Sequence, residues 1–281
     1  MNYQQLWRRL TPRYDEGEAK AIVRWLMDVR FGLSWTDILC GKMEALPAAE
    51  EEALEAMAGR LEQGEPVQYV AGVADFCGRT FRVNDAVLIP RPETEELCRW
   101  VVPTVPAAKG AGVRILDAGT GSGCIAVTLA AEMPEAEVTA WDISPAALET
   151  ASENARRNGV RVTFRQVDML SATWPDDDGP YDIIVSNPPY ICNKERARVD
   201  ANVLDNEPHL ALFVPDDDPL LFYRAMARYG RQALRDGGWL YFEINPLYAD
   251  ALAHLLSRMS FCDIEIRNDQ FGKQRFIKAS K

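Results

Sequence analysis

The sequence predicts an α/β protein in which a doubly wound, largely parallel sheet ends in an antiparallel hairpin, after a small helical domain and a β-hairpin linker. Three observations predict this fold. Apolar residues recur at helical spacing over the first 70 residues, strands alternate with helices from about residue 93, and two strands follow each other directly near the end. The expected boundaries are 1–71 for the helical domain, 72–91 for the linker and 92–281 for the α/β domain.

The first part of the chain has helical periodicity but no pattern of catalytic residues. Ile22, Trp25, Leu26 and Val29 follow the i, i+3, i+4, i+7 spacing of an amphipathic helix, and residues 54–61 repeat it. A small helical bundle explains these residues, and docking of the substrate is the function that we expect for it.

The linker has a different pattern. Phe76, Phe81, Val83 and Val87 alternate with glycine and polar residues, which indicates a β-hairpin or an extended segment. Pro90 then stiffens the entry to the α/β domain.

The α/β domain is predicted from short apolar runs separated by helical segments. The strands that we expect in alternation with helices are 114–118, 137–141, 162–166, 182–186 and 240–244. The last two strands, 262–267 and 275–278, are joined by a Gly-containing turn without a helix. A hairpin that closes a parallel sheet is typical of the Rossmann-like fold of class I methyltransferases rather than of dinucleotide dehydrogenases.

A glycine-rich loop follows the first of these strands. It reads Gly119-Thr120-Gly121-Ser122-Gly123 and leads into a helix. Glycines at such a turn let the backbone approach a ligand, and the helix N-terminus favours polar or anionic ligand atoms. The GxGxG spacing differs from the GxGxxG of nicotinamide-binding folds, so we expect these five residues to bind another nucleotide-like cofactor.

An acid follows the next strand. Asp142 lies 23 residues after Gly119, where a carboxylate can accept hydrogen bonds from both hydroxyls of a ribose. Ser144 is expected to cap the helix that comes next. The competing interpretation makes Asp142 a loop or capping acid, and the preceding glycines favour the ribose role.

Two residues after the third strand are candidates for an adenine contact. Asp168 can accept a hydrogen bond from an adenine amino group, and Met169 can pack on the ring. A solvated turn is the alternative for both.

The most specific signal follows the fourth strand, where the chain reads Asn187-Pro188-Pro189-Tyr190. A planar NH2 group beside a carbonyl or aromatic carbon is a poor nucleophile, because its lone pair is delocalised. The Asn187 side-chain oxygen and the Pro188 carbonyl can accept its two hydrogens, and the ring of Tyr190 can stack on the flat group. The motif therefore predicts transfer of a methyl group from S-adenosylmethionine to such a nitrogen, on either a base or a glutamine.

Composition limits the partners and the location. The chain has 31 Lys and Arg against 42 Asp and Glu, a net charge of −11, so we expect no direct binding of nucleic acid. Its six cysteines form no CxxC pair, which indicates reduced thiols in the cytoplasm and no metal site. No apolar run is long enough for a membrane helix. We expect a monomer.

Further motifs connect the chain to a known family. They read EPVQY at 65–69, FCG at 76–78, VLIPRPETE at 87–95, NPPY at 187–190, EPHLAL at 207–212 and FYR at 222–224. With the glycine loop, they resemble the HemK/PrmC family, the peptide chain release factor glutamine N5-methyltransferases. The resemblance spans nearly the whole chain.

The resemblance implies a substrate and roles for the site residues. The substrate is the glutamine in the Gly-Gly-Gln motif of class I release factors, and its methylation modulates translation termination. The glycine loop and Asp142 would bind S-adenosylmethionine, and Asn187 would touch both cofactor and glutamine. Pro188, Pro189 and Tyr190 would hold the substrate amide.

Three alternatives are weighed against this prediction. A sister enzyme methylates a glutamine of a large-subunit ribosomal protein, but its family resembles Arg-Ser-Pro where this chain has Arg91-Pro92-Glu93. An amino-methyltransferase acting on DNA or RNA would need a basic face. A non-catalytic binding protein would not need the glycine loop, Asp142 and the NPPY motif together.

The acidic stretch from Asp176 to Asp178 is expected to be a short surface insertion.

Overall fold

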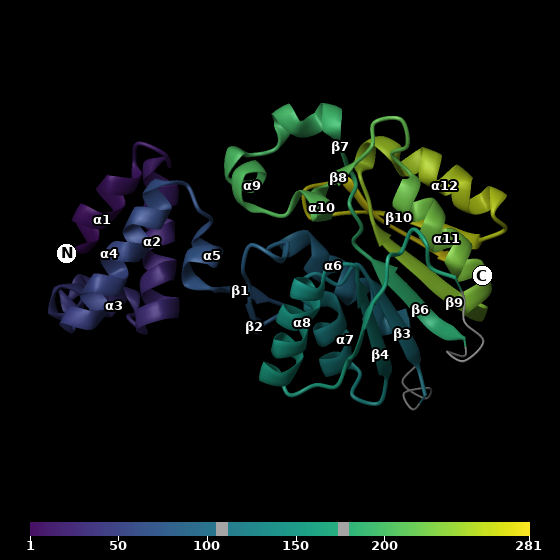
Figure 1. The fold of residues 1–281 in the computed structure, drawn as a ribbon, viewed down its shortest axis with the longest axis horizontal. Helices are drawn as coiled ribbons and strands as arrows, with labels where there is room; N and C mark the ends of the chain where they lie inside the picture. Colours follow the sequence, from purple (N-terminus) through teal and green to yellow (C-terminus); the bar gives the residue numbers. More distant parts are fainter. Residues whose placement is uncertain (105–111, 174–179) are drawn as a thin grey trace. The chain divides into compact units, whose positions relative to one another are not determined.

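The computed structural model describes residues 1–104, 112–173 and 180–281, and the expected insertion at 176–178 lies outside them. The chain divides into two compact units. One comprises Met1–Val73 and Ala201–Asn206, and the other comprises Ala74–Asp200 and Glu207–Lys281. The first unit is helical and the second is an α/β domain (Figure 1).

The helical unit consists of helices around an apolar core. Its elements are α1 (Tyr3–Leu10), α2 (Glu16–Phe31), α3 (Trp35–Leu39), η1 (Lys42–Ala45), α4 (Ala48–Glu62), α5 (Val67–Ala71) and α9 (Ala201–Asn206). Side-chain caps by Asn2, Asp15 and Ser34 begin the first three helices, because these side chains accept hydrogen bonds from backbone N–H groups that have no partner within the helix. Leu26 and Leu54 are among the residues buried between the helices.

The α/β unit begins with a hairpin and continues as alternating strands and helices. Its first elements are β1 (Val73–Phe76), which starts at the last residue of the helical unit, β2 (Arg79–Arg82), α6 (Pro92–Val101), η2 (Val102–Thr104), β3 (Arg114–Ala118), α7 (Cys124–Glu132), β4 (Glu137–Asp142), α8 (Pro145–Arg157), β5 (Thr163–Gln166) and β6 (Tyr181–Ser186). The remaining elements are β7 (Ile191–Cys192), η4 (Asn193–Arg198), α10 (His209–Leu212), β8 (Phe213–Val214), α11 (Leu221–Ala233), β9 (Leu234–Glu243), η5 (Pro246–Tyr248), α12 (Ala249–Arg258), β10 (Cys262–Asn268) and β11 (Gln274–Ser280).

The main sheet has the strand order β10-β11-β9-β6-β3-β4-β5. Neighbours from β9 to β5 are parallel, whereas β11 is antiparallel to both β9 and β10. This arrangement confirms the predicted fold class. The strand order reverses next to β3, and ligands of open α/β sheets bind at the carboxyl ends of the strands at such a point.

Alternation along the strands divides the core into two layers. Ile184 of β6 packs in a cluster with residues of α11 and α12, such as Met226 and Leu256. Its neighbours Ile183 and Val185 point to the other face and pack with residues of α6, α7 and α8. Helices therefore cover both faces of the sheet (Figure 1).

One strand differs from its expected bounds by more than two residues. β9 starts at Leu234, six residues before the expected 240. An irregularity in its register with β6 between Leu234 and Trp239 interrupts the alternation that marks a strand, and Gly237 there has φ +73°.

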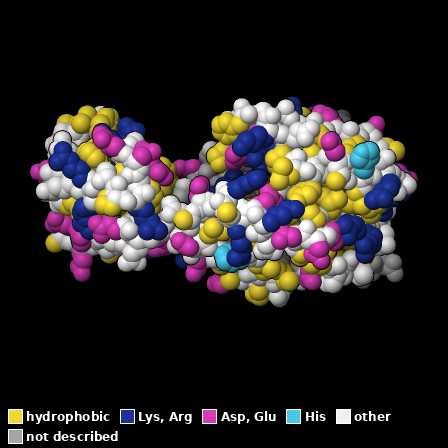
Figure 2. Space-filling view, turned by 90° about the horizontal axis from the view of Figure 1, so that it is seen from above, with side chains coloured by type: hydrophobic (Ala, Val, Ile, Leu, Met, Phe, Trp, Pro, Cys, Tyr) yellow, Lys and Arg dark blue, Asp and Glu magenta, His cyan; other side chains and the backbone are white. Residues whose placement is uncertain are grey.

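Within the described ranges, no helix is long and apolar enough to cross a membrane. On the face shown in Figure 2, acidic and basic side chains lie side by side, with hydrophobic side chains between them.

Candidate active site

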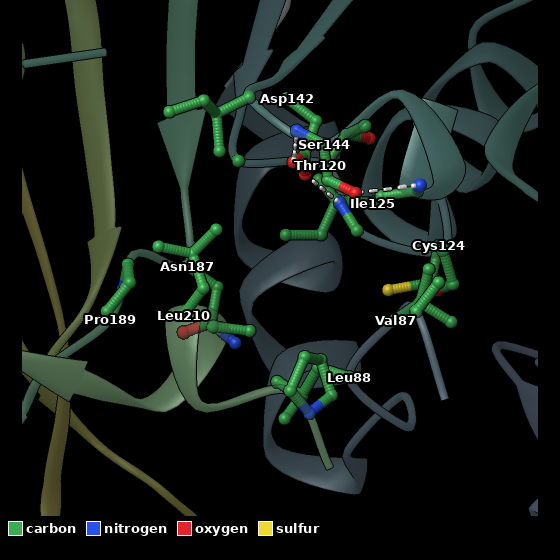
Figure 3. A pocket seen from close by; sticks show the side chains of 18 of the residues that line it. Val87, Leu88, Thr120, Cys124, Ile125, Asp142, Ser144, Asn187, Pro189 and Leu210 are labelled. Carbon is green, nitrogen blue, oxygen red and sulfur yellow. Dashed lines mark hydrogen bonds between the residues drawn. The ribbon is translucent and has the colours of Figure 1, made fainter. Parts of the chain in front are cut away.

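A pocket of about 250 Å³ lies in the α/β unit, at the carboxyl ends of β3, β4 and β6. Its walls include most of the predicted site residues, namely Gly119, Thr120, Gly121, Ser122, Asp142, Asp168, Met169, Asn187 and Pro189. In the view of Figure 3, Asn187 and Pro189 lie on one side of the pocket, and Val87 and Cys124 lie on the other.

The glycine loop adopts a conformation that only glycine takes readily. Gly119, Gly121 and Gly123 have φ of +78°, +53° and +81°. A Cβ atom on Gly119 would lie 2.9 Å from the Cε atom of Met169, inside normal contact distance. The backbone N–H groups of Gly119 and Thr120 both donate to the Trp141 carbonyl at 2.8 Å, which ties the loop to β4. The glycines of the loop therefore leave its backbone open to a ligand on either side of Thr120, and Gly123 is the N-cap of α7.

A buried acid supports the loop from within the sheet. The Oδ2 atom of Asp117 accepts hydrogen bonds from the Thr120 hydroxyl at 2.6 Å and from the Ala126 N–H at 3.2 Å. Its Oδ1 atom has no partner among the described residues, and the side chain is fully buried. Burial raises the pKa of Asp117 from 3.8 to about 7, against the two hydrogen bonds that lower it.

We expect Asp117→Asn to change the pH dependence of stability. Between about pH 4 and pH 7 the unfolded chain has lost the proton that native Asp117 keeps, so this group makes the protein less stable as pH rises through that window. Asparagine removes this contribution. The free energy of unfolding of the variant, relative to the wild type, should therefore increase by about 2–4 kcal/mol from pH 4 to pH 7.

Urea unfolding at several pH values measures this difference. Asp250→Asn, at an exposed position of α12, is the control for loss of a negative charge. A difference between Asp117→Asn and wild type that stays constant across the window would contradict the prediction.

Asp142 connects the end of β4 with the glycine loop. Its Oδ2 atom accepts from the Gly121 N–H and its Oδ1 atom accepts from the Ser144 N–H, both at 2.9 Å. Ser144 caps α8 by accepting from the Ala147 N–H, as predicted from the sequence. Each carboxylate oxygen keeps capacity for another donor on the pocket side. Asp142 can therefore hold the loop and accept hydrogen bonds from two hydroxyls of a ligand.

We expect Asp142→Ala to weaken binding of S-adenosylmethionine by about 10–150-fold, since a hydrogen bond to a charged acceptor contributes about 1.5–3 kcal/mol. Titration calorimetry measures the affinity. Glu149→Ala removes an exposed carboxylate of α8 that does not line the pocket, and it should bind like the wild type. Wild-type affinity in Asp142→Ala would exclude Asp142 from the cofactor site.

The two residues predicted to contact adenine both line the pocket. The Oδ1 atom of Asp168 accepts from the Leu170 N–H at 2.9 Å, which fixes the turn and leaves Oδ2 for a ligand. Met169 is half-buried against Gly119. Their contact with adenine stays a prediction.

The NPPY turn starts where β6 ends. The Ser186 hydroxyl donates to the Ala118 carbonyl at 2.5 Å, which joins the ends of β6 and β3 and sets the position of the turn. Asn187 is half-buried, and its Nδ2 atom donates to the Thr94 hydroxyl at 3.2 Å. Asn187 therefore faces the pocket with its amide held by a neighbour.

The other residues of the turn differ in their exposure to the pocket. Pro189 lines the pocket, Pro188 is buried, and the Tyr190 hydroxyl donates to Glu243 at 3.1 Å. Burial, and then the charge of Glu243, raise the pKa of Tyr190, so it remains a neutral phenol. Pro188 and Tyr190 are not among the described residues that line the pocket, and the predicted roles of the Pro188 carbonyl and the Tyr190 ring stay predictions.

A segment with no predicted role in the site also forms part of the wall. Residues 86–91 line the pocket, and Glu207, which is only 4% exposed, holds them. Its carboxylate accepts from the Ile89 N–H at 3.1 Å and pairs with Arg91 at 2.5 Å. The sequence signal for this part of the wall is a charged residue within or beside an apolar stretch, which occurs in the motifs at 87–95 and 207–212.

Comparisons with known proteins agree with this geometry. Residues 3–72 match the model of the PrmC N-terminal domain, and residues 98–209 match the methyltransferase small domain. The release factor glutamine methyltransferase of Bacteroides thetaiotaomicron is 46% identical over 268 residues, which cover 95% of this chain and 95% of that protein. Its namesake from Flavobacterium psychrophilum is 38% identical over 281 residues, covering 99% and 98%.

A solved methyltransferase from Pyrococcus furiosus shares the fold, with a TM-score of 0.51 at 15% identity over 72% of this chain and 88% of its own. The sheet, the glycine loop and Asp142 at the carboxyl edge define a class I S-adenosylmethionine-dependent methyltransferase. Within that class, the chain belongs to the release factor glutamine methyltransferase family.

Proposed function

We propose that this protein transfers a methyl group from S-adenosylmethionine to the side-chain amide nitrogen, N5, of the glutamine in the Gly-Gly-Gln motif of class I release factors. This reaction would modulate translation termination. The observation that carries the proposal is that Asn187 and Pro189 line the same pocket as the glycine loop and Asp142. The names of the relatives at 46% and 38% identity support the choice of substrate.

The residues of the pocket have the chemistry that the cofactor requires. The exposed backbone of the glycine loop would admit the amino acid portion, and the Asp142 carboxylate would accept hydrogen bonds from the ribose hydroxyls. Asp168 and Met169 would meet the adenine. Once bound, S-adenosylmethionine supplies a methyl group made electrophilic by its sulfonium.

In the reaction, the protein aligns a poor nucleophile. The Asn187 side-chain oxygen and the Pro188 carbonyl would accept the two hydrogens of the glutamine amide, and Tyr190 would stack on its plane. The amide nitrogen then faces the methyl group, and alignment supplies much of the rate acceleration. The nitrogen becomes acidic as its bond to carbon forms, so it releases one proton to solvent and needs no strong base.

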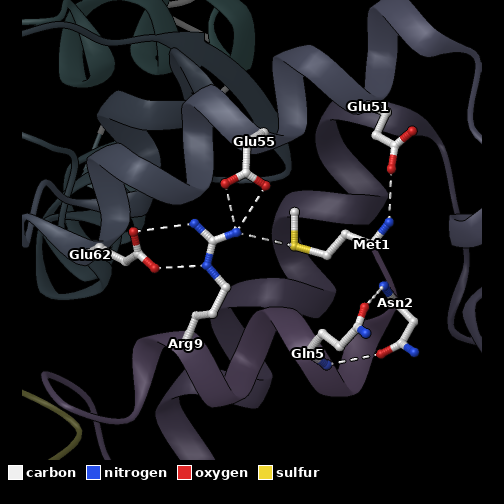
Figure 4. Close-up of polar contacts among 7 residues, drawn as sticks. All are labelled: Met1, Asn2, Gln5, Arg9, Glu51, Glu55 and Glu62. Carbon is white, nitrogen blue, oxygen red and sulfur yellow. Dashed lines mark hydrogen bonds and ion pairs between the residues drawn. The ribbon is translucent and has the colours of Figure 1, made fainter.

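The helical unit would dock the release factor. Its helices form one compact unit, in which Arg9 of α1 pairs with Glu55 and Glu62 of α4 at 2.7 and 2.8 Å (Figure 4). These partly exposed ion pairs add little to stability compared with the core. On α3, Trp35 and Leu39 are 43% and 68% exposed, and exposed apolar side chains of this kind suit a protein partner. We further propose that the enzyme acts as a monomer in the cytoplasm and binds no nucleic acid directly.

Mass spectrometry of a purified release factor tests the proposal. After incubation with enzyme and S-adenosylmethionine, the peptide that contains Gly-Gly-Gln should gain one methyl group on its glutamine. A release factor in which that glutamine is replaced by glutamate should gain none. Methylation of a large-subunit ribosomal protein, or of DNA or RNA, in place of the release factor would assign one of the alternative functions.

A further inference from the structure

We propose that Thr94 and Glu243 are positioning residues that determine which end of the Asn187 amide faces the substrate. This inference rests on the proposed function, because it concerns the acceptor for the glutamine amide. Thr94 lies in the first turn of α6, and Glu243 ends β9, 149 residues further along the chain. A hydrogen-bonded chain joins Glu243, Thr94 and Asn187.

The chain of hydrogen bonds is buried and short. The Thr94 hydroxyl donates to the Oε2 atom of Glu243 at 2.6 Å, and the Asn187 Nδ2 atom donates to the Thr94 hydroxyl oxygen at 3.2 Å. Thr94 and Glu243 are 2% and 1% exposed, so little water reaches them. Thr94 nevertheless lines the pocket, next to the place where the substrate amide would enter.

The number of available protons sets the direction of these bonds. The Thr94 hydroxyl donates to Glu243, and when Glu243 is ionised no other direction is open to this bond, because a carboxylate can only accept. The Thr94 oxygen can then only accept, and the group of Asn187 that faces it must be the NH2. The carbonyl oxygen of Asn187 is therefore directed away from Thr94, free to accept from the glutamine amide.

The same carboxylate also holds the aromatic ring of the motif. The Oε1 atom of Glu243 accepts from the Tyr190 hydroxyl, and the Tyr223 hydroxyl fixes the Glu243 backbone carbonyl at 3.1 Å. Burial raises the pKa of Glu243, whereas its two hydroxyl donors and the nearby charge of Arg275 oppose that rise. One buried acid thus orients both the acceptor and the stacking ring of the NPPY turn.

The reversed orientation of Asn187 would be unproductive. An NH2 group pointing into the pocket would meet the NH2 of the glutamine, and two donors cannot form a hydrogen bond. Without Thr94, nothing in this hydrogen-bonded chain distinguishes the two orientations. Thr94→Val keeps the shape of the side chain and removes both the acceptor for Asn187 and the donor to Glu243.

We expect Thr94→Val to lower kcat on release factor by about 10–150-fold, which corresponds to about 1.5–3 kcal/mol for a hydrogen bond to a charged group such as Glu243. KM and cofactor affinity should change by no more than about threefold, because binding contacts remain. Thr94→Ser keeps the hydroxyl and should recover most of the rate. Glu243→Gln offers one acceptor oxygen to two hydroxyls, so its kcat should fall at least as far as that of Thr94→Val.

A double-mutant cycle separates positioning from a general structural role. If Thr94 acts through Asn187, adding Thr94→Val to Asn187→Ala should cost less than about twofold in kcat. A loss in the double variant as large as in the wild-type background would overturn the proposal, as would a wild-type kcat for Thr94→Val.

A second readout does not depend on the release factor. In NMR spectra of the cofactor-bound protein, the Asn187 side-chain NH2 resonances, assigned through their loss in Asn187→Ala, should shift in Thr94→Val and return in Thr94→Ser. Resonances that are the same in all Thr94 variants would overturn the positioning role. Failure of the wild type to methylate release factor would instead overturn the proposed function.

Discussion

Asn187→Ala should slow methyl transfer to release factor by about 10²–10³-fold at saturating substrate, while the protein stays folded and binds cofactor. The substitution removes one of two acceptors for the amide hydrogens, and one oriented polar contact of this kind typically contributes that factor. The glutamine amide can then rotate away from the methyl group. Single-turnover rates measure the effect without interference from product release.

Asn187→Asp is the matched control. It retains an acceptor toward the substrate but replaces the NH2 group that donates to Thr94 with a second oxygen. That oxygen competes with Glu243 for the single proton of the Thr94 hydroxyl, so the side chain is less well oriented than asparagine. We therefore expect a rate between those of wild type and Asn187→Ala. Near-wild-type transfer by Asn187→Ala would show that another group holds the amide.

The fold could be predicted because its signals are local. The strand expected at 114–118 has those bounds in the structure, and the Ser144 cap and the hairpin of β10 and β11 depend on neighbouring residues. The early start of β9 was missed because a register irregularity around Gly237 hides the strand pattern. Periodicity reports a strand only where each residue faces the same side as the residue two positions away.

Parts of the site depend on contacts that no local pattern contains. The glycine loop, Asp142 and Asn187 follow strand ends, so parallel pairing brings them to one edge of the sheet. The bond between Thr94 and Glu243 joins residues 149 positions apart, and its existence depends on how α6 packs against β9. The sequence signals for this pair are an acid at the end of an apolar strand, Glu243, and the position of Thr94 within the motif at 87–95.

Removing residues 1–72 should separate docking from chemistry. If the helical unit docks the release factor, the truncated enzyme should lose about 10²-fold or more in kcat/KM on intact release factor, because tethering at a second site raises the effective concentration of the reacting segment by such factors.

A short peptide that carries the Gly-Gly-Gln motif is the matched substrate, since it lacks the surface that the helical unit would bind. Both enzymes should methylate the peptide at the same rate, so the preference for intact release factor over peptide should vanish on truncation. Residues 201–206 belong to the helical unit and lose its packing in the truncated chain. Cofactor affinity by calorimetry therefore has to show that the α/β unit is still folded. A folded truncated enzyme that keeps the full preference for release factor would show that docking occurs on the α/β unit.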